Sequence, residues 1–70
     1  MIKAGRRPLL SPREEMIVLR LADGLSVPDI ATRLEVAEAT ERSRIRRVER
    51  KLNAKSQLHA VATALREHLI

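Results

Sequence analysis

The chain has 70 residues, a net charge of +5, and no cysteine, phenylalanine, tyrosine or tryptophan. A chain this short forms one small domain, and without cysteine it has neither disulfides nor thiolate zinc sites to stabilise it. The basic excess favours a polyanionic partner, and the lack of aromatic side chains on which unpaired bases would stack favours duplex DNA over single strands.

Residues 1–9 precede the first helical pattern and carry Lys3, Arg6 and Arg7, so the sequence predicts a flexible basic arm there. Residues 10–70 are expected to form the folded domain. No apolar run is long enough for a membrane span, and the N-terminus lacks the apolar core of a signal peptide. The expected location is therefore the cytoplasm.

A first helix is predicted over about residues 12–23. Ser11, Pro12 and Glu14 stand in the order of a capping box, in which the serine and glutamate side chains each accept a backbone N–H group. Gly24 stands where a left-handed residue would end the helix. The apolar residues that recur at helical spacing between these two signals are Ile17, Val18, Leu21 and Ala22.

A shorter second helix is predicted after Ser26, its expected N-cap, with Ile30, Ala31 and Leu34 on its inner face. A third helix, over about residues 38–52, follows a short turn. The spacing between the two is that of a helix-turn-helix, in which the second helix enters the major groove of DNA. Asn53 can adopt the left-handed conformation that would end the third helix.

The third predicted helix concentrates basic side chains. On a helical wheel, Ile45, Val48 and Leu52 share one sector, with Glu41 at its N-terminal end. The basic residues occupy the other sectors: Arg42, Arg44, Arg46, Arg47, Arg50 and Lys51. A solvated surface helix can carry such charge. However, like charges one turn apart repel unless an anion is near, and with the helix-turn-helix spacing this favours DNA binding.

A fourth helix is predicted over residues 57–69, after the N-cap Ser56. Its expected core face consists of Leu58, Val61, Ala62, Leu65 and Leu69. That assignment leaves Ala60 and Ala64 exposed, where they would either serve only as helix formers or permit close contact with a second copy. In the second case the dimer interface would comprise Gln57, Ala60, Val61, Ala64 and His68.

No group of residues in the sequence supports catalysis. His59 and His68 are on different turns and do not converge on a metal. The capping box explains Glu14, and a solvated helix surface explains Glu15. We therefore expect a protein that is not an enzyme, with no cofactor, no metal and no small-molecule substrate.

Six short segments occur in a fixed order: LSPRE at 10–14, ADGLS at 22–26, IATRL at 30–34, EAT at 38–40, KLNAKS at 51–56 and AVATAL at 60–65. Together they resemble the LuxR/GerE-type helix-turn-helix domain of bacterial transcription regulators. The resemblance implies a compact, all-α four-helix domain, associated with the bacterial nucleoid. Its third helix would read the major groove, and its fourth would pair two copies. It also implies a stand-alone, GerE-like regulator, unless the chain is an excised fragment.

The resemblance further implies which residues touch DNA. Base contacts fall to Arg42, Ser43 and Arg46. Phosphate contacts are expected from Arg33, Thr40, Arg47, Arg50, Lys51, Lys55 and Ser56. The implied partners are double-stranded DNA and a second copy of the chain, with RNA polymerase or another regulator as a further candidate, and no membrane.

The chain departs from the family pattern at several positions. Glu35 replaces a glycine, so the turn before the third helix is expected to be strained. Ala37 replaces a capping serine. Glu41 replaces an apolar residue and Arg44 a histidine. Because a buried carboxylate is costly unless paired, Arg44 is the expected partner of Glu41.

Two other interpretations stay open at this stage. The segment TERSRIRR also resembles the helix-turn-helix of sigma-factor region four, which would make the chain a monomer that binds RNA polymerase. Alternatively, Glu35 and Glu41 have converted the motif into a protein-interaction module that no longer reads DNA.

Overall fold

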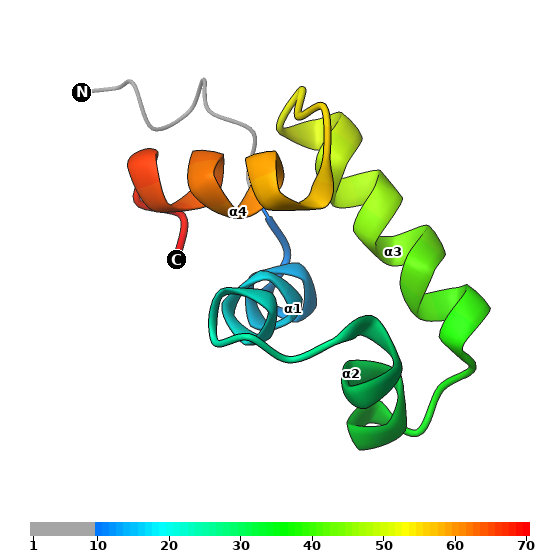
Figure 1. Cartoon of the computed structure of the whole chain (residues 1–70). Coiled ribbons are helices and arrows are strands. Elements are labelled where there is room, and N and C mark those ends of the chain that lie inside the picture. Colours follow the sequence, from blue (N-terminus) through cyan, green and yellow to red (C-terminus); the bar gives the residue numbers. More distant parts are fainter. Residues whose placement is uncertain (1–9) are drawn as a thin grey trace.

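The computed structural model describes residues 10–70, which form four α-helices and no strand (Figure 1). The helices are α1 (Pro12–Ala22), α2 (Val27–Leu34), α3 (Glu38–Lys51) and α4 (Gln57–Arg66). The predicted all-α fold is confirmed, with α2 and α3 as the helix-turn-helix. The basic arm predicted over residues 1–9 lies outside the described residues. None of the four helices is long and apolar enough to cross a membrane.

Serine side chains begin three of the four helices. The Ser11 hydroxyl accepts the N–H group of Glu14 at 3.1 Å, and the Glu14 carboxylate accepts the N–H group of Ser11 at 2.8 Å, which confirms the capping box. Ser26 and Ser56 cap α2 and α4 through their hydroxyls. The exception is α3, where Ala37 supplies no side-chain cap and roughly 1 kcal/mol of capping is forgone.

Each helix ends in a left-handed residue, and the N–H group of the next residue bonds the carbonyl five positions back. This is the Schellman motif, which satisfies carbonyls that the helix leaves unpaired. The left-handed residues are Gly24, Glu35, Asn53 and His68. The predictions for Gly24 and Asn53 are confirmed. At Glu35, φ is 57°, a conformation that glycine adopts with less strain.

The fourth helix is shorter than the sequence predicts, ending at Arg66 instead of residue 69. His68 takes a φ of 59°, and the N–H group of Leu69 bonds the carbonyl of Ala64 at 2.8 Å. This turn folds Leu69 and Ile70 back against the apolar core. Leu69 thus contacts the core as expected, but from beyond the helix.

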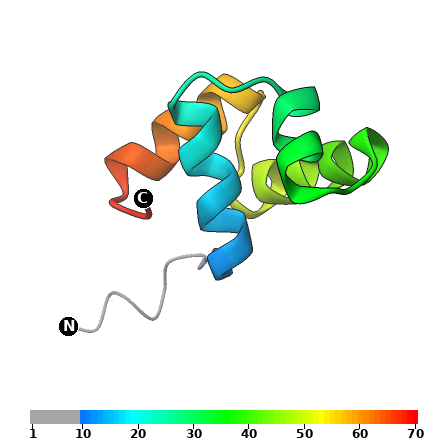
Figure 2. The same cartoon turned by 90° about the horizontal axis from the view of Figure 1, so that it is seen from below.

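Both α1 and α3 pack against all three other helices (Figures 1 and 2). Two adjacent residues on α1 enter two different apolar clusters. Val18 packs with residues of α3 and α4, whereas Ile17 packs with residues of α2 and α3. Within residues 10–70, α2 and α4 have no close backbone approach. They are therefore held on different sides of α1.

The inward face of α4 lies largely opposite the predicted one, although the predicted core residue Val61 also packs against the core. Ala60 and Ala64 are only 3% and 0% exposed, whereas Leu58 and Leu65 are 79% and 54% exposed. Side chains of α1 and α3 already fill the space facing α4, so α4 packs closely through methyl groups. The expectation that Ala60 and Ala64 are exposed is wrong, and their burial argues against a contact of these two side chains with a second copy.

An ion pair that the sequence analysis did not predict joins the start of α1 to the end of α3. Lys51 Nζ donates to Glu14 Oε1 at 2.8 Å. Burial alone would raise the pKa of Glu14, but hydrogen bonds from Lys51 and Ser11 outweigh burial and lower the pKa below its ordinary value. Glu14 therefore caps α1 and anchors α3 with the same carboxylate.

Replacing Glu14 tests this double role. Glu14→Gln keeps an acceptor for the capping box but removes the charge that binds Lys51. At pH 7 we expect the variant to lose about 1 kcal/mol of unfolding free energy, because Lys51 is partly exposed. The pKa of Glu14 is lowered in the folded state. Its charge therefore contributes stability above the unfolded pKa of about 4.5, and this stability is lost as pH falls through the folded pKa.

Thermal melts followed by circular dichroism from neutral to acid pH measure this dependence. The difference between parent and Glu14→Gln should narrow below the unfolded pKa and vanish below the folded one. A difference that stays constant over the whole pH range would contradict the assignment.

Candidate nucleic-acid interface

The core contacts of α3 fix which of its side chains face solvent. Glu41, Ile45 and Val48 are buried, and so the opposite side of the helix is exposed. The exposed residues on that opposite side are Ala39, Ser43, Arg46, Arg47 and Arg50. We call these five residues the outer face of α3. It contains two of the three expected base contacts, and the third, Arg42, lies at its edge.

The outer face carries positive charge that the described residues do not neutralise. Arg46, Arg47 and Arg50 form no ion pair within residues 10–70. Arg42 differs, since its Nη2 and Nε donate to Glu38 Oε2 at 2.6 and 3.0 Å. About half of each side chain of this pair is exposed, so the pair adds little stability and is readily exchanged for another anion.

A shallow depression of about 100 Å³ joins this surface to the start of α4. Arg42 and Arg46 line it together with Val27 and Gln57. Two expected base contacts therefore lie beside the segment that carries the expected phosphate contacts Lys55 and Ser56. Gln57, which was expected in a dimer interface, lies at this depression.

The other expected phosphate contacts are not all equally available. Arg33 at the end of α2 and Thr40 on α3 are exposed, as are Lys55 and Ser56. The Lys51 side chain is also partly exposed, but its ammonium group is bound to the Glu14 carboxylate.

The expected dimer residues do not form one face of α4. Ala60 and Ala64 are in the core, and Val61 is half-buried and packs against the same cluster. His68 is exposed but lies beyond the end of the helix. The outward side chains that the sequence analysis missed are Leu58 and Leu65. Their helical spacing does indicate an apolar stripe on α4, but the same spacing is expected of a stripe that faces the core.

Glu41 is fully buried at the first turns of α3. Arg44 Nη1 lies 3.5 Å from Glu41 Oε1, which confirms the expected ion pair. Neither carboxylate oxygen has a hydrogen-bond partner among the described residues. Arg44 faces away from Arg42 and Arg46, because it lines a separate depression with residues of α1 and α2. The pair therefore belongs to the interior and does not place a carboxylate on the outer face.

Removing the buried charge should stabilise the domain. Glu41→Val is expected to raise the free energy of unfolding by about 1–4 kcal/mol, because an apolar side chain replaces a poorly satisfied carboxylate. Arg44→Ala should instead lower it, because Glu41 loses its ionic partner. In the Glu41→Val background, Arg44→Ala should be nearly neutral.

Urea unfolding of the parent, both single variants and the double variant completes a double-mutant cycle for this pair. If Arg44→Ala lowers stability equally in both backgrounds, then Arg44 does not act through Glu41.

Residues 8–64 match the family described as bacterial regulatory proteins, luxR family. The chain belongs to the LuxR family. This match confirms the resemblance carried by the six sequence segments and decides against the sigma-factor interpretation.

Two relatives of this LuxR-family domain are named as probable transcriptional regulators. The domain is 40% identical over 63 residues to the probable transcriptional regulatory protein NarL of Mycobacterium tuberculosis, covering 90% of this chain and 29% of NarL. It is 42% identical over 52 residues to the probable HTH-type transcriptional regulator GfsR of Streptomyces halstedii, covering 74% of this chain and 21% of GfsR.

A solved structure shares the fold of the LuxR-family domain. The response regulator ChrA of a heme-sensing two-component system superposes with a TM-score of 0.84 and 33% sequence identity. The match covers 91% of this chain and 32% of the ChrA chain. The domain therefore spans about a third or less of the length of each of these proteins.

Proposed function

We propose that this LuxR-family domain binds double-stranded DNA and regulates transcription, with α3 in the major groove. The observation that carries the proposal is the outer face of α3, where Arg46, Arg47 and Arg50 are exposed without ionic partners among the described residues. A single α-helix fits the major groove, and duplex DNA supplies the missing anions. The names of NarL and GfsR, both transcriptional regulators, support the same function.

Within this proposal, the DNA sequence is recognised by base contacts from Arg42, Ser43 and Arg46. Ser43 and Arg46 project from the outer face, and Arg42 exchanges Glu38 for a base or phosphate on binding. Phosphates are contacted by Arg33, Thr40, Arg47, Arg50, Lys55 and Ser56. We assign Lys51 to the ion pair with Glu14 instead of to DNA.

The burial of Glu41 favours DNA binding over a pure protein-interaction module. Glu41 is fully buried, so its carboxylate does not repel phosphates from the outer face. Glu35 lies in the turn before α3 and keeps the left-handed geometry that joins the two helices. The change at Glu41 therefore affects stability more than the charge that DNA would meet, whereas Glu35 is exposed in the turn.

Two basic residues should respond differently to alanine substitution. Arg46 can place two donors on guanine O6 and N7, so Arg46→Ala should cost about 1–3 kcal/mol and relax preference at one base position. Lys55 precedes α4 and would meet only phosphate. Lys55→Ala should therefore weaken all sequences alike and reduce the salt slope by about 1.

Binding isotherms on a specific and a scrambled duplex, measured across a salt series, separate the two effects. The specific duplex is first obtained by selection from a random-sequence pool. Equal losses on both duplexes for Arg46→Ala would contradict base reading by α3, while leaving electrostatic DNA binding intact. Absence of binding to any duplex would contradict the proposed function itself.

We further propose that two copies pair through the outward face of α4. Leu58, Ala62 and Leu65 recur at helical spacing on the side opposite to Ala60 and Ala64. Two exposed leucines on one stripe of so small a domain are an apolar surface suited to a self-complementary contact. Pairing would place two α3 helices on two half-sites of the same duplex.

Leu65→Glu should weaken this pairing. A carboxylate facing its own symmetry mate is repelled, while the exposed position lets the helix tolerate the change. Sedimentation velocity and titration of duplexes with one or two half-sites measure the effect. Leu19→Glu, which alters an exposed leucine on α1, is the matched control. If both variants sediment and bind two half-sites like the parent, pairing through α4 is wrong.

A further inference from the structure

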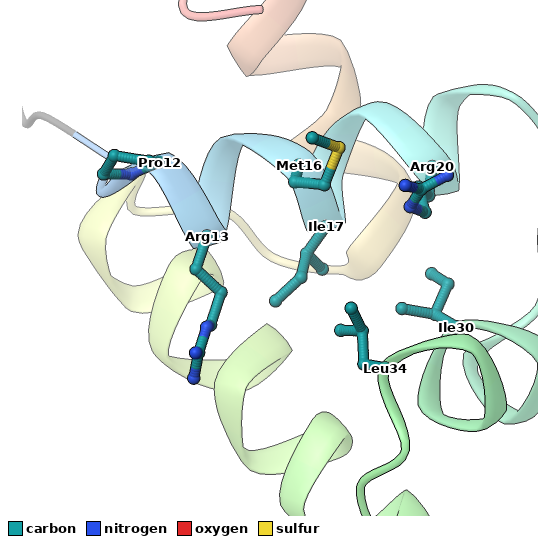
Figure 3. A pocket seen from close by; sticks show the side chains of 7 residues that line it. All are labelled: Pro12, Arg13, Met16, Ile17, Arg20, Ile30 and Leu34. Atoms are coloured by element: carbon teal, nitrogen blue, oxygen red, sulfur yellow. The ribbon is translucent and has the colours of Figure 1, made fainter.

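An apolar groove of about 300 Å³ runs between α1 and α2 (Figure 3). Its walls are Met16 and Ile17 from α1, and Ile30 and Leu34 from α2. In Figure 3, Arg13 and Arg20 lie toward opposite ends of the α1 side, with the apolar side chains between them. None of these residues belongs to the outer face of α3 or to the outward stripe of α4.

The apolar part of the groove is open to a partner. Met16 is 46% exposed, although it stands next to Ile17, which is fully buried in the core. A flexible methionine side chain over an apolar floor adapts readily to the side chains of a binding partner. The core of the domain does not need Met16 for its own packing, since neither apolar cluster includes it.

The two arginines give the groove a charge preference. Neither Arg13 nor Arg20 forms an ion pair within the described part of the chain. The Nε atom of Arg20 is also buried without an acceptor there. A buried donor without an acceptor is destabilising, and a carboxylate at this end of the groove would offset it by pairing with the guanidinium group.

The positive character continues beyond the groove toward α3. A neighbouring depression of about 180 Å³ shares Arg13 and Leu34 with the groove and adds Val36 and Arg44. Arg44 is partly engaged by Glu41, but at 3.5 Å and without a hydrogen bond to it. The continuous surface is therefore apolar along its length and basic at intervals, which complements an acidic amphipathic partner.

We propose that this groove binds an acidic amphipathic helix of a partner protein while α3 remains free for DNA. Arg13 and Arg20 lie about two turns apart along α1, or roughly 10 Å, with Met16 and Ile17 between them. A helix lying against α1 matches this pattern when it carries carboxylates at i and i+7 and aliphatic residues at i+3 and i+4. This is recognition of a helix by an apolar groove, with the arginines fixing its position.

The test uses the whole chain and two synthetic peptides. One peptide of about 16 residues, long enough for partial helicity in water, carries glutamate at i and i+7 and leucine at i+3 and i+4. The matched peptide has lysine in place of both glutamates. Each is titrated into the 15N-labelled chain saturated with a DNA duplex, so that the basic outer face of α3 is already occupied. Amide chemical shifts locate the bound peptide.

The acidic peptide should shift amides of α1 and α2, and the lysine peptide should bind at least about tenfold more weakly. Met16→Glu should weaken the acidic peptide by a similar factor without changing DNA affinity, whereas Leu19→Glu should change neither. Arg20→Glu should weaken the acidic peptide and strengthen the lysine peptide. This exchange of preference distinguishes a charge contact from a loss of folding, which would abolish binding of both peptides.

Three outcomes would overturn the proposal. The first is no shift in α1 or α2 at millimolar acidic peptide, and the second is equal affinity for both peptides. The third is shifts of the same amides with rising protein concentration alone, which would make a second copy the occupant. If the chain binds no duplex, the titration is run on the free chain. A lack of DNA binding is thus distinguished from a lack of peptide binding in the groove.

Discussion

Two neighbouring side chains of α1, Ile17 and Val18, must each complete a different apolar cluster. Both are only 1% exposed, yet one packs toward α2 and α3 and the other toward α3 and α4. The chain has no aromatic residue with which to build a larger single core, and both aliphatic clusters draw on α1 and on α3. The packing of α1 against α3 therefore constrains where α2 and α4 can lie, and hence how the outer face of α3 is presented.

The polar contacts reinforce this arrangement at the ends of the helices. Glu14 closes the first turn of α1 and binds Lys51 at the last turn of α3, so one carboxylate links the start of one helix to the end of another. At the opposite end of α3, Glu41 is carried into the interior by the same rotation that exposes Arg46 and Arg47. The orientation that creates a basic surface thus also buries a carboxylate, and Arg44 offsets only part of the cost.

Local signals in the sequence were sufficient for the four helix starts, for the ends of the first three helices and for the outer face of α3. Capping serines and left-handed residues act within a few positions of one another, and the buried sector of α3 follows from its own periodicity. The inner face of α4 could not be predicted in this way. Leucines and alanines form competing apolar stripes on that helix, and the choice depends on how much space α1 and α3 leave. The Glu14–Lys51 pair spans 37 positions and has no local signal. The groove likewise exists only once α1 and α2 are brought together.

The four Schellman turns bear on how the domain could change over evolution. Only Gly24 takes its left-handed conformation without a side-chain penalty, whereas Glu35, Asn53 and His68 hold it with a Cβ atom present. Left-handed backbone costs roughly 1–2 kcal/mol for most such residues, with asparagine tolerating it best. A domain this small therefore retains strain in its turns that single substitutions could release. The stability gained by such a substitution would offset the cost of destabilising changes on the surfaces of α1, α3 and α4, so that binding specificity could change without loss of the fold.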